Sequence, residues 1–94
     1  MSFKKGDIVK IRCESQPGPF DDVAITISSD TGVVSGFVKR SLVEKRGDEA
    51  FVLGKVVKVD GDMIEVQIPG SFFTSARGVT SLPRAWADSN MEHA

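Results

Sequence analysis

This chain of 94 residues has one cysteine, one histidine and no tyrosine. A single thiol cannot form an internal disulfide, and zinc sites need three or four converging ligands, usually cysteine or histidine. Because Cys13 and His93 lie far apart in the sequence, we expect neither a zinc site nor a nucleophile–histidine arrangement. We therefore predict a protein that is not an enzyme and that needs no cofactor and no metal.

Charge excess and long apolar runs are absent too. Twelve lysine and arginine residues nearly balance thirteen aspartate and glutamate residues, so no net field draws the molecule onto nucleic acid or an anionic membrane. No apolar stretch approaches the roughly 18–20 residues that span a bilayer. The amino terminus reaches charged residues at once and lacks the apolar core of a signal peptide. We expect a cytoplasmic protein without membrane contact.

What the sequence does contain is regular alternation, most clearly from Phe51 to Pro69. Apolar residues recur at every second position around Asp60-Gly61-Asp62, namely Phe51, Leu53, Val57 and Val59 before it and Ile64, Val66 and Ile68 after it. Asp-Gly supplies the positive φ of a tight turn, and β-branched residues suit a half-buried sheet. The stretch predicts a β-hairpin that places these apolar side chains on one face.

Shorter alternating runs predict further strands over residues 8–13, 22–28, 33–39 and 79–82. Two prolines and a glycine predict a loop over residues 14–19. Pro83 opens a short helical turn in which Trp86 packs back on the body. Nothing in residues 88–94 would hold the chain down, so we expect one domain over residues 1–87 followed by a disordered tail.

These elements predict the fold class. Five to six short antiparallel strands with a short C-terminal helical turn are typical of an all-β protein. A chain of this length fills a two-layer sandwich poorly, whereas a small, strongly bent barrel removes exposed sheet edges. We predict a single small β-barrel.

Two segments carry a resemblance to known modules. Residues 5–11, Lys-Gly-Asp-Ile-Val-Lys-Ile, resemble the opening strand of SH3-like barrels, and residues 54–66 are similar to the hairpin of KOW-type modules, G-x-V-x-x-V-x-G-D-x-I-x-V. The KOW-type hairpin usually begins near a domain start, whereas here it lies past the middle. Without tyrosine, the aromatic groove with which signalling SH3 domains bind proline-rich peptides cannot form in its usual way. The resemblance implies an SH3-like barrel with a binding role and identifies no binding residues.

Aromatic and arginine side chains gather in the least regular part of the chain, and both types are enriched at binding hot spots. The residues are Phe72, Phe73, Arg77, Arg84 and Trp86. Our first hypothesis is a non-catalytic binding or accessory module that contacts another protein through them. In the alternative, Phe72, Phe73 and Trp86 cap the open end of the barrel.

Basic residues offer a second surface, and the candidates for one basic face are Lys39, Arg40, Lys45, Arg46, Lys55 and Lys58. Together they predict an RNA- or DNA-binding module as the alternative function. The interspersed Glu44, Asp48 and Glu49 are equally consistent with a solvated surface. A third alternative is an enzyme whose chemistry no motif reveals. We expect a monomer or a weak homodimer, since an exposed edge strand would allow pairing.

Overall fold

The computed structural model describes residues 2–72 and 79–94, and for residues 71 and 72 the backbone only. Within these residues lie β1 (Ile8–Pro17), β2 (Asp22–Ser29), β3 (Gly32–Lys39), β4 (Val43–Arg46), β5 (Glu49–Asp60), β6 (Met63–Gln67), β7 (Ser71–Phe72), β8 (Val79–Pro83) and β9 (Met91–His93). A 3₁₀ turn, η1 (Arg40–Leu42), precedes β4, and one helix, α1 (Arg84–Asn90), precedes β9.

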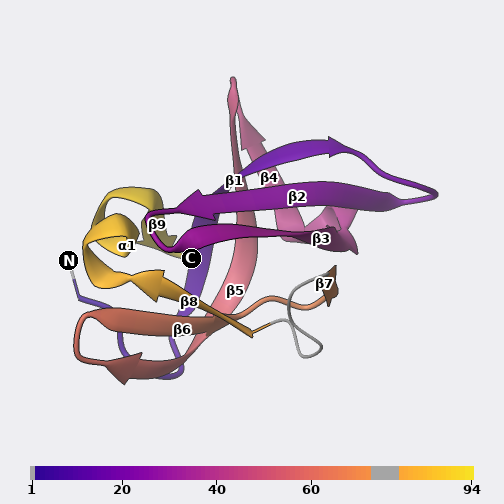
Figure 1. The fold of residues 1–94 in the computed structure, drawn as a ribbon. Coiled ribbons are helices and arrows are strands. Elements are labelled where there is room, and N and C mark those ends of the chain that lie inside the picture. The colour runs from indigo at the N-terminus through magenta and orange to yellow at the C-terminus, as the bar shows by residue number, and fades with distance from the viewer. Residues whose placement is uncertain (1, 73–78) are drawn as a thin grey trace.

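The strands form a single antiparallel sheet that curls into a nearly closed barrel (Figure 1). Its order is β7-β3-β2-β1-β5-β6-β8, with β4 paired to β5 and β9 paired to β1. The prediction of a small all-β barrel is therefore confirmed, and the architecture agrees at the level of the fold with the SH3-like resemblance. No helix in the described parts of the chain is long and apolar enough to cross a bilayer.

The core lies where the inner faces of the strands meet. Val9, Ile11 and Cys13 on β1 are buried, and so are Ile25 and Ile27 on β2, as the alternation predicts. Other buried contributors are Phe3, Val38, Ala50, Val52, Val56, Ile64, Val66, Ile68, Leu82, Ala87 and Met91. Trp86 packs against this cluster from α1, which confirms its predicted contact with the body.

The predicted inner face of β5 is wrong over its first half. The core-facing residues there are Ala50, Val52, Gly54 and Val56, whereas Leu53 lies on the outer face. The register between β5 and β6 shifts between Val56 and Lys58, so β5 carries one extra residue at that point. An extra residue exchanges the two faces of a strand. The simple alternation read across the bulge therefore assigned the wrong face.

Two other expectations need correction. Residues 14–17 were expected to form a loop, but they extend β1 and pair with β2, from Glu14 opposite Thr26 to Pro17 opposite Val23. Residues 88–94 were expected to form a disordered tail, but β9 pairs with β1, and Met91 is buried. Burial of Met91 and the backbone hydrogen bonds of β9 give this segment the attachment that its composition did not reveal.

Candidate functional site

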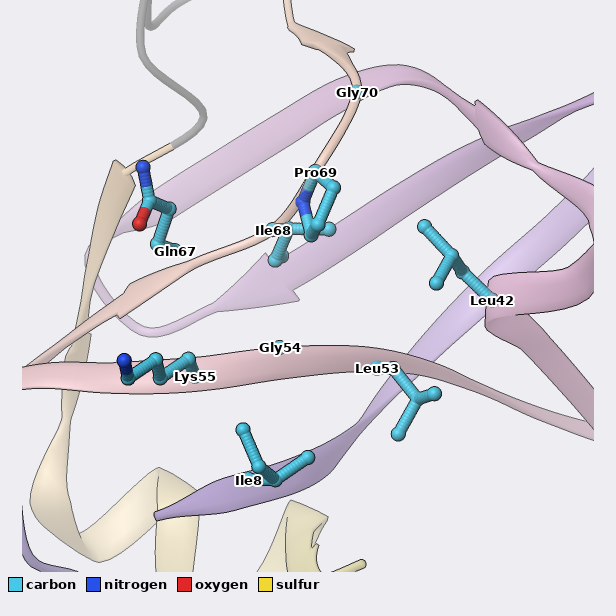
Figure 2. A pocket seen from close by; sticks show the side chains of 9 residues that line it. All are labelled: Ile8, Leu42, Leu53, Gly54, Lys55, Gln67, Ile68, Pro69 and Gly70. Carbon is cyan, nitrogen blue, oxygen red and sulfur yellow. The ribbon is translucent and has the colours of Figure 1, made fainter. Parts of the chain in front are cut away.

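A groove on the outer surface of the barrel is the strongest candidate site. We call it the Lys55 groove; it has a volume of about 470 Å³ and is lined by Ile8, Leu42, Leu53, Gly54, Lys55, Gln67, Ile68, Pro69 and Gly70. Figure 2 shows Ile68 and Pro69 on one flank and Leu42 reaching in from η1 on the other, with Gly54 of β5 beneath them in this view. Its lining is mostly apolar, although the groove is open to solvent.

The groove forms where β5 changes partners. From Glu49 to Val52 the strand pairs with β4, and from Lys55 to Asp60 it pairs with β6. Leu53 and Gly54 lie between these two pairings, so the sheet divides there on one side of β5. Because β4 and β6 diverge from this point, Leu42 before β4 and Pro69 after β6 become the two walls.

Gly70 fixes the far wall. Its φ is 153°, within the range that favours glycine, and a Cβ atom built there would lie 2.5 Å from the Phe37 carbonyl oxygen and 2.9 Å from Val38 Cγ1. Only glycine allows the chain to pass so close to β3. Pro69 has no N–H to donate, which suits a chain that is leaving the β5–β6 ladder. The local sequence Ile68-Pro69-Gly70 thus builds one side of the groove.

Lys55 gives the groove its charge. Among the described residues that line it, this lysine is the one charged group, and it forms no ion pair with any other described residue. Ile8, directly opposite Lys55 in the β1–β5 register, leaves 51% of its surface exposed. The arrangement suits a ligand that has an apolar part and, next to it, a negatively charged group that can pair with Lys55.

The structure does not gather the described members of the predicted aromatic and arginine surface. Phe73 and Arg77 lie outside the described residues. Phe72 belongs to β7, which pairs with β3, whereas Arg84 and Trp86 lie on α1 at the opposite side of the barrel in Figure 1. The Arg84 guanidinium donates to the Gly61 carbonyl oxygen at 3.3 Å, in the β5–β6 turn.

The predicted basic face is divided as well. Arg46 is ion-paired with Glu44 and Glu92, and these carboxylates, Glu92 most of all, raise the pKa of its guanidinium. That guanidinium also lies 4.6 Å from the centre of the Phe51 ring, which it helps to cover. Lys58 Nζ lies 3.8 Å from an Asp60 carboxylate oxygen and 3.9 Å from a Glu65 carboxylate oxygen.

Two basic residues do converge. Arg40 and Lys45 line a second, smaller groove of about 240 Å³ with Ser15, Gln16, Pro17, Val23 and Val43. We call it the Arg40 groove. Lys45 pairs with Ala50 on β5. Ala50 precedes Lys58 by eight residues on that strand, which corresponds to about 26 Å of extended chain, so Lys58 lies far from Lys45. Lys39, next to Arg40 in the chain, lines a different hollow together with Asp22.

The Cys13 thiol and the His93 imidazole do not form a nucleophile–base pair. Cys13 is buried, and that burial raises the pKa of its thiol to about 11. His93 stacks on Phe3, with ring centres 4.8 Å apart, and its Nε2 lies 3.0 Å from an Asp7 carboxylate oxygen. Over the described residues, no three histidine, cysteine or acidic side chains lie close enough together to hold a metal ion.

Sequence reasoning missed the Lys55 groove and one further residue, Phe20, which is 98% exposed. Apolar Ile8 and Leu53 fall on the outer faces of their strands, beside the charged Lys10 and Lys55, and this break in the pattern was the available signal. Comparisons with protein-family models, curated proteins and solved structures found no match for this chain.

Proposed function

We propose that this protein is a non-catalytic interaction module that binds an apolar, acidic segment of a partner protein in the Lys55 groove. The observation that carries the proposal is the combination of a mostly apolar groove of about 470 Å³ with one lysine that has no ion-pair partner among the described residues. Apolar grooves with a few placed polar groups are the usual form of binding sites. The proposed partner is a protein, as in the first hypothesis from the sequence. The proposed contact surface is the Lys55 groove, in place of the aromatic and arginine residues between positions 72 and 86.

Apolar contact and charge would contribute differently to binding in this groove. Ile8, Leu42 and Leu53 offer apolar surface that a partner side chain would remove from water, at about 25 cal/mol per Å² buried. Lys55 would steer an acidic neighbour and set its orientation, since charges at an interface rim act mainly on association rate and specificity. Short apolar segments flanked by aspartate or glutamate meet both requirements.

Capture experiments with groove variants test this function. Immobilised protein is incubated with lysate of the source cell, and bound proteins are identified by cross-linking and mass spectrometry. Leu53→Asp places a carboxylate among apolar walls and Lys55→Glu reverses the rim charge, so both variants are expected to lose the partner. Val33→Asp is the control, because Val33 is an exposed apolar strand residue that does not line the groove. Equal capture by the wild type and all three variants would contradict the proposal.

The Arg40 groove supports a second candidate function, the binding of nucleic-acid phosphates. Arg40 and Lys45 form no ion pair within the described part of the chain, and their groove has polar neighbours in Ser15 and Gln16. With two converging cations, the log–log salt slope of RNA affinity should be only about −1.4 to −1.8. Arg40→Ala should reduce that slope by roughly half, and no RNA binding at low salt would exclude this candidate.

A further inference from the structure

The turn between β1 and β2 holds a phenylalanine out in water. Phe20 has 98% of its surface exposed. Its backbone φ is 56°, a conformation that residues other than glycine rarely adopt. The Gly18 N–H donates to the Asp22 carbonyl oxygen and the Asp22 N–H donates to the Pro19 carbonyl oxygen, both at 3.1 Å. These bonds hold the backbone of the turn, and the Phe20 side chain lies in solvent. Exposure and backbone strain at one residue together indicate a function outside the isolated barrel.

The Phe20 turn and the Lys55 groove are neighbours on the surface. Asp22, two residues after Phe20, lines a hollow together with Leu42, Pro69 and Gly70, and those three residues also line the Lys55 groove. The Phe20 ring of the same molecule nevertheless stays outside the groove, as its exposure shows. A two-fold axis placed between turn and groove would bring the turn of each molecule to the groove of the other.

The two surfaces are complementary in chemistry. The turn offers an aromatic ring flanked by Pro19 and followed by the acidic Asp21 and Asp22, of which Asp21 is exposed. The groove offers apolar walls with one lysine and, among its described lining residues, no acidic group. Its volume of about 470 Å³ falls in the range, roughly 300–1,000 Å³, of pockets that hold drug-sized ligands. A phenyl ring fits that space, and an aspartate beside it would face Lys55.

We propose that the Lys55 groove takes the Phe20 turn of a second copy of this chain, in a reciprocal two-fold dimer. The inference rests on the proposed function, since it names the partner of the same groove. Each dimer contains two identical contacts, in which Phe20 enters the apolar walls and Asp21 pairs with Lys55. Closure by the two-fold axis limits the assembly to a dimer, because each molecule uses both its turn and its groove.

Sedimentation equilibrium over a wide concentration range measures this association with the whole protein. Phe20→Ala removes both aromatic anchors, and at about 30-fold for each hot-spot contact the dimer dissociation constant should rise about 1,000-fold. Val33→Ala is the matched control, because it removes exposed apolar surface from the β2–β3 hairpin, and it should leave the constant unchanged. Asp21→Lys should weaken the dimer, and the added change Lys55→Asp should restore it.

Mixing two defective variants gives a sharper result. Phe20→Ala retains the groove and Leu53→Asp retains the turn, so each alone should be monomeric while an equimolar mixture forms a heterodimer with one intact contact. A labelled sample titrated with a peptide of residues 16–23 should show amide shifts at Leu53 and Lys55, and the same peptide with Phe20→Ala should show none. The peptide readout does not depend on the folding of any variant.

The outcomes separate this proposal from the function on which it rests. A wild-type protein that stays monomeric at millimolar concentration, or a Phe20→Ala variant that dimerises like the wild type, overturns the dimer. If Leu53→Asp and Lys55→Glu still lose a captured partner, the groove function stands without self-recognition. If those variants capture as the wild type does, the groove function itself fails. Binding of phosphatidylcholine vesicles that requires Phe20, with no dimer, would instead assign the turn to membranes and overturn the proposal.

Discussion

Gly54 is the position at which one added methyl group should be most informative. It lies on the core-facing side of β5 at the floor of the Lys55 groove. A Cβ atom built there would lie 3.0 Å from Ile11 Cδ1, 3.2 Å from the Gln67 carbonyl oxygen and 3.3 Å from Ile68 Cγ1. Gln67 is held by its pairing with Lys55, and both isoleucines are buried, so none of the three atoms moves freely.

The expected net effect of Gly54→Ala is a loss of stability. Overpacking of a core costs about 1–3 kcal/mol. Replacement of glycine by alanine restricts the unfolded chain, which returns about 0.4–1 kcal/mol. The free energy of unfolding should therefore fall by about 1–2 kcal/mol, which lowers the midpoint of thermal unfolding by about 5–15 °C in a domain of this size. Urea and thermal denaturation followed by circular dichroism measure both quantities.

A double-mutant cycle identifies the atom responsible. Ile11→Val removes the Cδ1 atom that lies nearest to the added methyl group, so Gly54→Ala should cost less in that background than in the wild type. The coupling free energy should be at least about 0.5 kcal/mol. A Gly54→Ala protein as stable as the wild type would refute the overpacking argument. Strict additivity of the two changes would refute the assignment to Ile11.

Three further predictions concern the turn and two titrating groups. Phe20→Gly should stabilise the monomer by about 0.5–1 kcal/mol in urea denaturation, because glycine adopts the φ of 56° without strain; an unchanged or lower stability would contradict this. Burial raises the pKa of Cys13 from 9.0 to about 11, so the folded protein binds more protons and stability should fall between those pH values; the Cys13→Val variant should lack this component, and parallel profiles would contradict it. The pKa of Asp7 is lowered by the Lys4 N–H and then by His93, so its stabilisation is present above pH 3.8 and lost on acidification; Asp7→Asn should flatten that acid limb in urea denaturation.

The strands were predictable because their periodicity is local. Val9, Ile11 and Cys13 on β1 and Ile64 and Val66 on β6 were assigned to the core from alternation alone, and the structure buries them. An antiparallel strand with one solvated face leaves this pattern in the sequence. The all-β class and the small barrel followed from the number and spacing of such runs.

The errors arose where the local pattern depends on distant partners. The bulge between Val56 and Lys58 is a feature of the pairing between β5 and β6, whose register shifts there. The alternation read over residues 51–59 did not reveal it. The attachment of residues 91–93 to β1 likewise depends on a strand about eighty residues earlier, so composition predicted a tail instead. Both are consequences of pairing between segments that are remote in sequence.

The candidate site shows the same division. The sequence determined that the chain forms a small β-barrel, since hydrophobic period and turn residues act over a few positions. It also showed that few reactive side chains are present. Only the tertiary structure decided that Leu42, Leu53 and Ile68 meet around Lys55, that Arg40 and Lys45 share a groove without Lys58, and that Phe20 is exposed. A surface of this kind is made by strands that change partners, and the choice of partners is a property of the whole fold.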